Sequence, residues 1–169
     1  MFNKESMLSP KELVLAVERV FINSGFTVKS FNYMENGFIE FNLLKNQPFI
    51  ISVNVRNIGS AYLPNKPYIL RRQVGKMIFE SIPDNGQTKL SMLLGVENKN
   101  NKLLLACWNP FYFIGHSTNR SCYVLESSLD EAYEKGFYDG VDCKTPVLVC
   151  SENNFEKLLH IYIERNAVE

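Results

Sequence analysis

Two segments of this 169-residue sequence combine basic side chains with neutral hydrogen-bonding side chains and contain no acid. The first is RNIGSAYLPNKPYILRRQ at residues 56–73, and the second is NPFYFIGHSTNRS at residues 109–121. Arginine and lysine neutralise phosphates and can donate to guanine, asparagine can pair with adenine, and hydroxyl groups can contact either. This mixture predicts contacts with the grooves and backbone of double-stranded DNA.

Arginine and lysine at 56, 66, 71, 72 and 120 are expected to contact phosphates or guanines, and the other polar residues to supply further hydrogen bonds. Prolines at 64 and 67 would hold the first segment extended and lower the entropy lost on docking. Each residue alone has an ordinary explanation, such as a tyrosine packed on a sheet or a solvated turn, so the pair of segments carries the argument. The candidate DNA-binding residues are Arg56, Asn57, Ser60, Tyr62, Asn65, Lys66, Arg71, Arg72, Gln73, Asn109, Tyr112, His116, Ser117, Thr118, Asn119 and Arg120.

The formal net charge is zero, but the charges are segregated along the chain. Residues 41–125 carry ten basic and three acidic side chains, whereas residues 126–169 carry four basic and ten acidic ones. A protein that binds a polyanion with one face and stays soluble through the rest has this asymmetry. The alternative is that an acidic helical region simply attracts a basic sheet region.

A second kind of chemistry is suggested by Pro83-Asp84 followed by Glu97-Asn98-Lys99, the spacing of PD-(D/E)xK metal-dependent nucleases. There the carboxylates hold magnesium and the lysine stabilises charge. Here Asp84 lies in a PDNG turn and ENKNNK is typical of a hairpin tip, which would leave the carboxylates on loops. We therefore expect this chain to be no enzyme and to use no cofactor or metal, with the nuclease as the alternative.

The remaining candidates for chemistry are weak. Four cysteines without a Cys-x-x-Cys pair favour reduced, small buried thiols over disulfides, although Cys107, His116 and Cys122 could form an incomplete zinc site. No apolar stretch approaches the ~18 residues that span a bilayer, and the first ten residues do not resemble a secretory signal. We expect a cytoplasmic, soluble protein that does not bind membranes.

Helix signals occur only towards the ends of the chain. Ser9-Pro10-Lys11-Glu12 is a capping box that predicts a helix over 10–24, Ser128 and Gly136 bound a short second helix, and Ser151 precedes a third over 152–165. Between them, short apolar or alternating runs with turn signals at PDNG and NKNN predict strands. The sequence thus predicts a single domain, 1–169, that is α+β and mainly β: an open pseudobarrel of about seven strands over roughly 37–150.

The runs PYILRRQVG, LSMLLGVENKNNKLLLACWNP and SCYVLESSLDEAYEKG resemble the B-three-like pseudobarrel DNA-recognition domains of restriction enzymes of the EcoRII, NgoAVII and LlaJI type. The resemblance covers roughly residues 50–140 and departs at Asn109, where an acid is common. It implies two arms, 56–72 and 109–121, that grip the major groove. It also implies a target-recognition module of a phage-defence restriction–modification system, attached to an effector domain or subunit.

The sequence therefore predicts a sequence-specific double-stranded DNA-binding module that lacks catalysis of its own. A nuclease using Asp84, Glu97 and Lys99 is one alternative. A non-catalytic protein-interaction domain, whose acidic C-terminal helices bind a basic partner, is the other.

Overall fold

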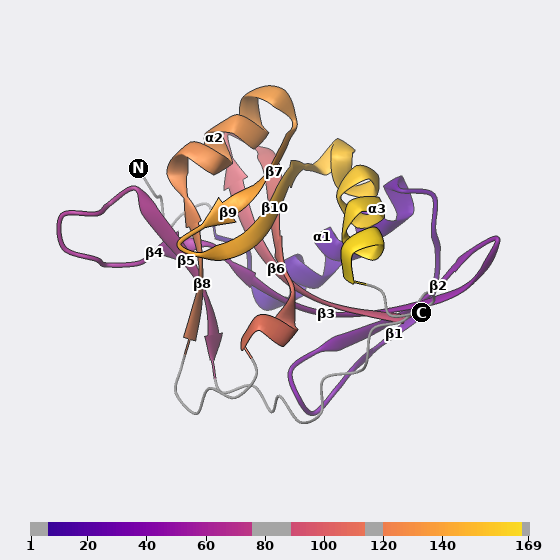
Figure 1. Cartoon of the computed structure of the whole chain (residues 1–169). Coiled ribbons are helices and arrows are strands. Elements are labelled where there is room, and N and C mark those ends of the chain that lie inside the picture. Colours follow the sequence, from indigo (N-terminus) through magenta and orange to yellow (C-terminus); the bar gives the residue numbers. More distant parts are fainter. Residues whose placement is uncertain (1–6, 76–88, 114–119, 167–169) are drawn as a thin grey trace.

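The structure is a computed structural model that describes residues 7–75, 89–113 and 120–166. Over these ranges the chain is α+β and mainly β, as expected, and the strands form no closed barrel (Figure 1). The helices are α1 (Pro10–Asn23), α2 (Glu126–Lys135) and α3 (Phe155–Asn166), with the 3-10 helices η3 (Pro110–Phe113) and η4 (Glu152–Asn154). The strands are β1 (Thr27–Tyr33), β2 (Ile39–Lys45), β3 (Gln47–Asn57), β4 (Gly59–Ser60), β5 (Ile69–Gly75), β6 (Lys89–Lys99), β7 (Lys102–Trp108), β8 (Arg120–Leu125), β9 (Phe137–Asp142) and β10 (Thr145–Ser151).

The helix ends follow local sequence signals. The side chain of Ser9 accepts a hydrogen bond from the Glu12 amide at 3.2 Å, and Glu12 accepts one from the Ser9 amide at 3.0 Å, so the expected capping box forms. Gly136 ends α2 in the left-handed conformation that glycine adopts most easily. α2 begins two residues before Ser128, and α3 begins only at Phe155 because η4 follows Ser151.

Seven strands form one mixed sheet in the order β1-β2-β3-β6-β7-β10-β9, and β4, β5 and β8 form a second sheet. The β3–β6 pair is parallel, whereas β5 and β8 pair antiparallel. Asn100 and Asn101 have φ of 52° and 61° and make the tight turn between β6 and β7 that the asparagine-rich sequence predicts.

The two faces of the large sheet pack against different hydrophobic cores. One core lies under α1 and α3 and includes Val17, Phe41 and Tyr162. The other joins the sheet to the small sheet and α2 through side chains such as Trp108 and Val124. Because neighbouring residues of a strand point to opposite faces, β6 supplies side chains to both cores.

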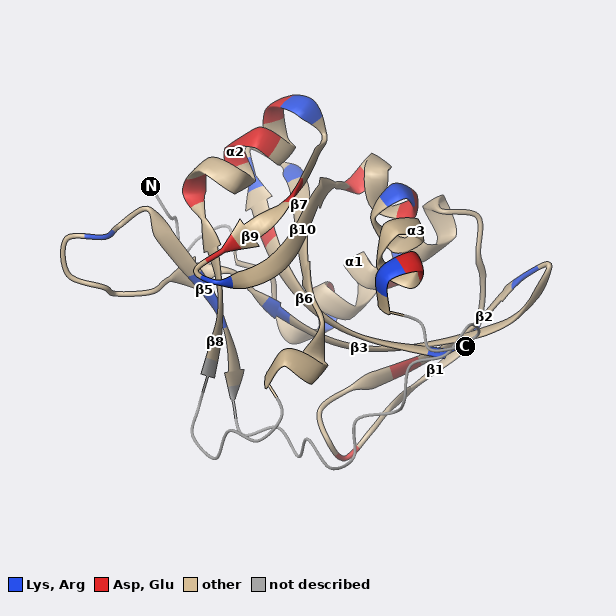
Figure 2. Cartoon of the chain, viewed as in Figure 1, with Lys and Arg blue, Asp and Glu red and all other residues tan. Residues whose placement is uncertain are grey.

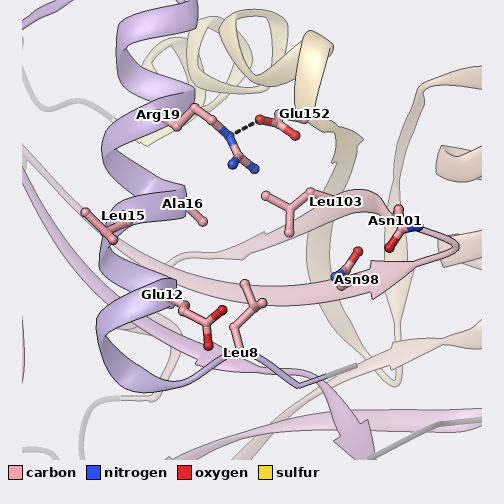
Figure 3. A pocket seen from close by; sticks show the side chains of 9 residues that line it. All are labelled: Leu8, Glu12, Leu15, Ala16, Arg19, Asn98, Asn101, Leu103 and Glu152. Atoms are coloured by element: carbon pink, nitrogen blue, oxygen red, sulfur yellow. Dashed lines mark hydrogen bonds and ion pairs between the residues drawn. The ribbon is translucent and has the colours of Figure 1, made fainter. Parts of the chain in front are cut away.

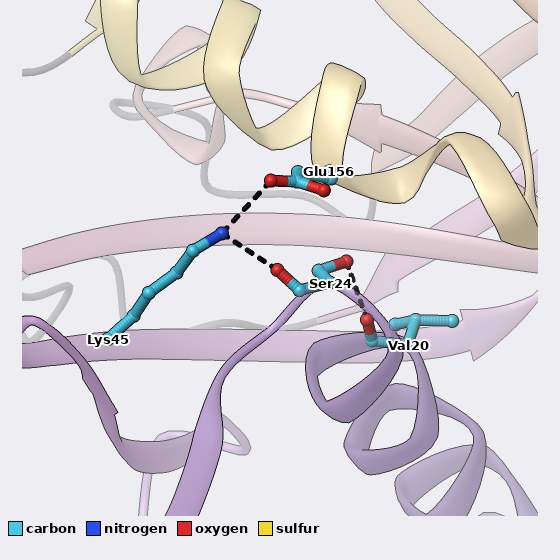
Figure 4. Close-up of polar contacts among 4 residues, drawn as sticks. All are labelled: Val20, Ser24, Lys45 and Glu156. Atoms are coloured by element: carbon cyan, nitrogen blue, oxygen red, sulfur yellow. Dashed lines mark hydrogen bonds and ion pairs between the residues drawn. The ribbon is translucent and has the colours of Figure 1, made fainter.

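Lys45 connects the two helices that cover the first core. Its Nζ donates to the backbone oxygen of Ser24, at the end of α1, at 2.9 Å and to Oε1 of Glu156, in α3, at 3.0 Å (Figure 4). The same ammonium lies 5.2 Å from the centre of the Phe26 ring. A basic residue of the large sheet is thus engaged in packing the helices together.

Several parts of the fold differ from the sequence prediction. β1 and β9 were not expected, because TVKSFNY is exposed along most of its length and FYDGVD contains a glycine and two acids. The expected strand KMIFE and the PDNG turn lie outside the described residues. Cys107, Cys122 and Cys150 are buried thiols as predicted, but Cys143 is exposed. Within the described ranges, no helix is both long and apolar enough to cross a membrane.

Candidate nucleic-acid interface

The first predicted segment forms a loop that projects from the body of the protein. Residues 61–68 connect β4 to β5, which pair through Gly59 with Arg71 and Ser60 with Leu70. Every residue from 62 to 68 is exposed, and Figure 1 shows the loop extending away from both sheets. Its base is anchored by the Tyr68 carbonyl, which accepts a hydrogen bond from the Glu126 amide at 2.8 Å.

The β9–β10 turn lies near Lys66 of this loop and contains Lys144, which the sequence analysis did not select. Cys143 and Lys144 both have left-handed backbones, with φ of 48° and 70°, and make the tight turn. Burial, and to a smaller extent the charge of Asp142, raise the pKa of the Cys143 thiol. The positive charge of nearby Lys66 lowers it in part. The turn is held in place by buried Asp142, which accepts hydrogen bonds from the Leu125 amide at 2.9 Å and Tyr138 Oη at 2.7 Å.

Three cations and the exposed loop make up a surface that we name the basic corner: Lys66, Arg71, Lys144 and residues 62–68. The Arg71 guanidinium lies 5.9 Å from the centre of the Tyr62 ring. Among the described residues, no carboxylate lies within ion-pair distance of these three cations. Figure 2 shows basic colouring and no acid on the loop between β4 and β5, whereas acids line α2. The basic corner can therefore attract an anion without first breaking an internal salt bridge.

Elsewhere the basic and acidic parts of the chain do attract each other. All the ion pairs between described residues take their acid from residues 126–169. Lys45 and Lys99, from the basic middle of the sequence, are both paired in this way. The hypothesis of simple internal attraction therefore holds for these lysines and not for the basic corner. The pairs are Arg19–Glu152, Lys45–Glu156, Lys99–Asp130, Lys135–Glu131 and Arg165–Asp139.

The prediction that Arg72 contacts DNA is wrong for this structure, because its side chain is fully buried. Leu70, Arg72 and Val74 point to the same side of β5, into the second core. The guanidinium donates to Asn54 Oδ1, and burial lowers its pKa to about 10, so it remains charged at neutral pH. Its Nε and Nη1 find no hydrogen-bond partner among the described residues. The alternation of apolar residues around Arg72 in YILRRQV was the signal that could have revealed this.

The other predicted residues of the first segment divide into free and engaged side chains. Arg56, Tyr62, Asn65, Lys66 and Gln73 are exposed, and Ser60 and Arg71 are half-buried. Asn57 is engaged with the backbone of Leu8, accepting from its amide at 3.0 Å and donating to its carbonyl at 2.8 Å. Asn57 therefore holds the N-terminal segment.

The second predicted segment is only partly described. Asn109 accepts from the Phe111 amide at 2.9 Å and donates to Asn166 at 2.7 Å, whereas Tyr112 is 55% exposed on η3. His116, Ser117, Thr118 and Asn119 lie outside the described residues. Of Arg120 the structure gives the backbone, at the start of β8.

The described ends of the two segments do not emerge side by side. Loop 61–68 joins β5 at Ile69, which pairs with Leu125, whereas Arg120 pairs with Gly75 at the other end of the same strands. Six residue steps of a strand separate these ends by roughly 20 Å. Figure 1 shows the loop at one side of the molecule and η3 at another. The described ends of the two segments therefore lie apart. Most of the second predicted arm falls outside the described residues, so the grip by two arms stays a prediction.

Two residues of the nuclease alternative, Glu97 and Lys99, do not lie where the sequence predicted. Glu97 and Lys99 lie within β6 and not on the hairpin tip, and they share one side of the strand. Burial raises the pKa of Glu97, whose Oε2 has no hydrogen-bond partner in the part of the chain that the structure describes. Lys99 is engaged with Asp130 at 2.6 Å. Asp84 lies outside the described residues, among which no cluster suited to a metal ion occurs.

A pocket of about 370 Å³ lies between α1 and the β6–β7 hairpin (Figure 3). Its charged residues already have partners: Glu12 belongs to the capping box, and Arg19 pairs with Glu152. The hydrogen bonds from Ser9 lower the pKa of Glu12, so this carboxylate stays ionised at neutral pH. Each charged residue among the described lining residues of the pocket is thus already engaged.

Fold and surface together define an α+β domain with two packed sheets and one basic, aromatic loop. Residues 49–159 match the model of the methylase-associated X1 (MTaX1) family, and the chain belongs to that family. The match begins in β3 and ends in α3, so it includes the basic corner. The family description connects the chain with methylases and points to a role related to restriction and modification, which an accessory domain would fit. No curated protein and no solved structure matched the chain.

Proposed function

We propose that this chain is a sequence-specific double-stranded DNA-binding module of a restriction–modification system. The observation that carries the proposal is the basic corner: Lys66 lies in the exposed loop, Arg71 lies against Tyr62, and Lys144 follows Cys143, which is near Lys66. These three cations lack carboxylate partners among the described residues. Unpaired cations release counterions when they meet phosphates, which favours binding to a polyanion. The methylase association of the family supports the same context.

In this proposal Lys66, Arg71 and Lys144 contact phosphates, while Asn65 and Ser60 supply hydrogen bonds to the groove. Exposed Arg56, at the end of β3, extends the surface. Phosphate contacts position such a module, and contacts with base edges provide its specificity. The domain would deliver this specificity to a methylase or nuclease, as a separate subunit or as part of a longer protein.

The proposal is tested by incubating the protein with randomised duplexes and sequencing the DNA that is retained. Enrichment of one motif is expected. Retention without enrichment would mean non-specific binding and would contradict sequence-specific recognition. An absence of retained DNA would contradict DNA binding altogether and favour the protein-interaction alternative.

Paired variants locate the contact surface. The double variant Lys66→Ala and Lys144→Ala should reduce the salt slope of duplex binding by about two units, one for each lost phosphate contact. The control is Lys45→Ala with Lys135→Ala, which removes equal charge from ion-paired positions. Equal slopes for the two double variants would contradict the assignment of the basic corner.

A further inference from the structure

Tyr62 has an unusual combination of backbone, exposure and neighbours. Its φ is 53°, a left-handed conformation that a bulky side chain rarely adopts. Its side chain is 75% exposed, and the backbone amide donates to Ser60 Oγ at 3.1 Å. The loop thus holds a large aromatic ring away from the core at a local cost in backbone energy, and such strain is often found at functional positions.

The Tyr62 ring has a cation against it and partly exposed apolar side chains in the same loop. The Arg71 guanidinium lies over the ring at 5.9 Å from its centre, in an arrangement typical of a cation–π contact. Leu63 and Tyr68, in the same loop, are 38% and 49% exposed. An aromatic ring that is exposed beside a cation suits a planar, electron-rich partner that carries negative charge nearby. A nucleobase with its phosphate has this chemistry.

On the basis of the proposed function, we propose that Tyr62 stacks on a base of bound DNA that has lost the stacking contact with one of its neighbours. In regular duplex DNA the faces of the bases are covered, so the ring requires an opened step or an unpaired base. Arg71 would contact the adjacent phosphate while remaining against the ring. The loop then acts as an aromatic wedge, in addition to a polar surface in the groove.

The inference predicts a preference that can be measured before the recognition sequence is known. One probe is a fully paired 20-base-pair duplex, and the other is the same duplex with one additional, unpaired adenine. The unpaired base is already partly unstacked, so the protein should bind the second probe about tenfold more tightly. Tyr62→Phe should keep the preference because it keeps the ring, whereas Tyr62→Ala should lose it.

Two further measurements separate stacking from general effects. Tyr33→Ala, at an exposed tyrosine at the end of β1, is the matched control and should leave the preference unchanged. 2-Aminopurine placed at the unpaired position should lose fluorescence on binding the natural protein and not on binding Tyr62→Leu. Thermal unfolding of each variant checks that it is folded.

The outcomes distinguish this inference from the proposed function. Equal affinity for both probes, or a preference that survives in Tyr62→Ala, would overturn the wedge while leaving DNA binding intact. Failure of the natural protein to bind either probe, together with no DNA retained from the randomised duplexes, would overturn both. A preference lost in Tyr62→Ala and kept in Tyr62→Phe and Tyr33→Ala supports the wedge.

Discussion

Two groups of basic residues in this protein occupy different electrostatic environments. Around the helices, Lys45, Lys99 and Arg165 lie within 3.0 Å of carboxylates from the acidic C-terminal third of the chain. In the basic corner, Lys66 and Lys144 are exposed without such a partner among the described residues. A count of charges by segment treats all these residues alike, although only the second group is available to an external polyanion.

Arg71 and Arg72 show the same contrast in adjacent residues. Arg71 points outwards against Tyr62, whereas Arg72 points into the core and binds Asn54. Asn54 in turn donates to the Gly37 carbonyl at 3.0 Å, which connects β5, β3 and the β1–β2 turn. One arginine is therefore placed for binding and the other for holding the small sheet against the large one.

Truncation of Arg72 should give the largest effect on stability. Arg72→Ala removes a fully buried side chain and leaves a cavity beside Asn54, which should cost about 2–5 kcal/mol in the free energy of unfolding. Arg72→Met should cost much less, because it fills the space and removes the unpaired Nε and Nη1. Denaturant unfolding measures both, and equal losses would contradict the role assigned to packing.

Charge reversal should separate the two groups of cations. Lys144→Glu is expected to weaken duplex binding at low salt by about tenfold or more, with little change in stability, because its ammonium has no described carboxylate partner. Lys45→Glu is expected to leave binding nearly unchanged but to lower stability by roughly 1 kcal/mol, since it places an acid beside Glu156. An equal loss of duplex affinity in Lys144→Glu and Lys45→Glu would contradict the assignment of the two lysines to different environments.

Glycine at position 62 should separate stability from function within the basic corner. Because φ is 53°, Tyr62→Gly is expected to be about 1 kcal/mol more stable than Tyr62→Ala. Both variants lack the ring, so both should lose the preference for the unpaired base. Chemical denaturation compares the two variants. Equal stabilities would mean that residue 62 relaxes out of the left-handed conformation.

The smallest expected effect concerns Glu97. Burial raises its pKa, so the folded protein retains a proton at pH values where the unfolded chain has lost it. As the pH rises above the ordinary glutamate pKa, the ionisation of Glu97 therefore lowers the free energy of unfolding. Glu97→Gln should be slightly more stable than the natural protein at pH 7, with the difference vanishing towards pH 4. Melting temperatures across this range measure it, and a constant difference would contradict the assignment.

The same residue tests the nuclease alternative. If the chain cuts DNA, cutting should depend on magnesium and be abolished in Glu97→Ala. We expect no cutting by the natural protein, since Lys99 is already paired with Asp130 and no metal-binding cluster occurs in the part of the chain that the structure describes. Magnesium-dependent cutting that Glu97→Ala removes would establish the alternative.

The elements that sequence analysis predicted are those defined by neighbouring residues. The capping box at Ser9, the asparagine turn at 100–101 and the glycine at 136 each depend on a few adjacent residues, and each is present. β1 was missed because an edge strand exposed along most of its length lacks the apolar alternation of a buried one. Lys144 was missed because its turn is not adjacent in sequence to the loop that it accompanies.

The sequence by itself determined the α+β class, the capped first helix and the acid-free composition of residues 56–73, because these depend on local propensity and on residue types. Only the tertiary structure decided which cations are neutralised by the acidic helices, that Arg72 is internal, and that Lys144 joins Lys66. These outcomes depend on distances between residues far apart in the chain, and such distances are fixed by packing across two sheets and not by any pattern within one segment.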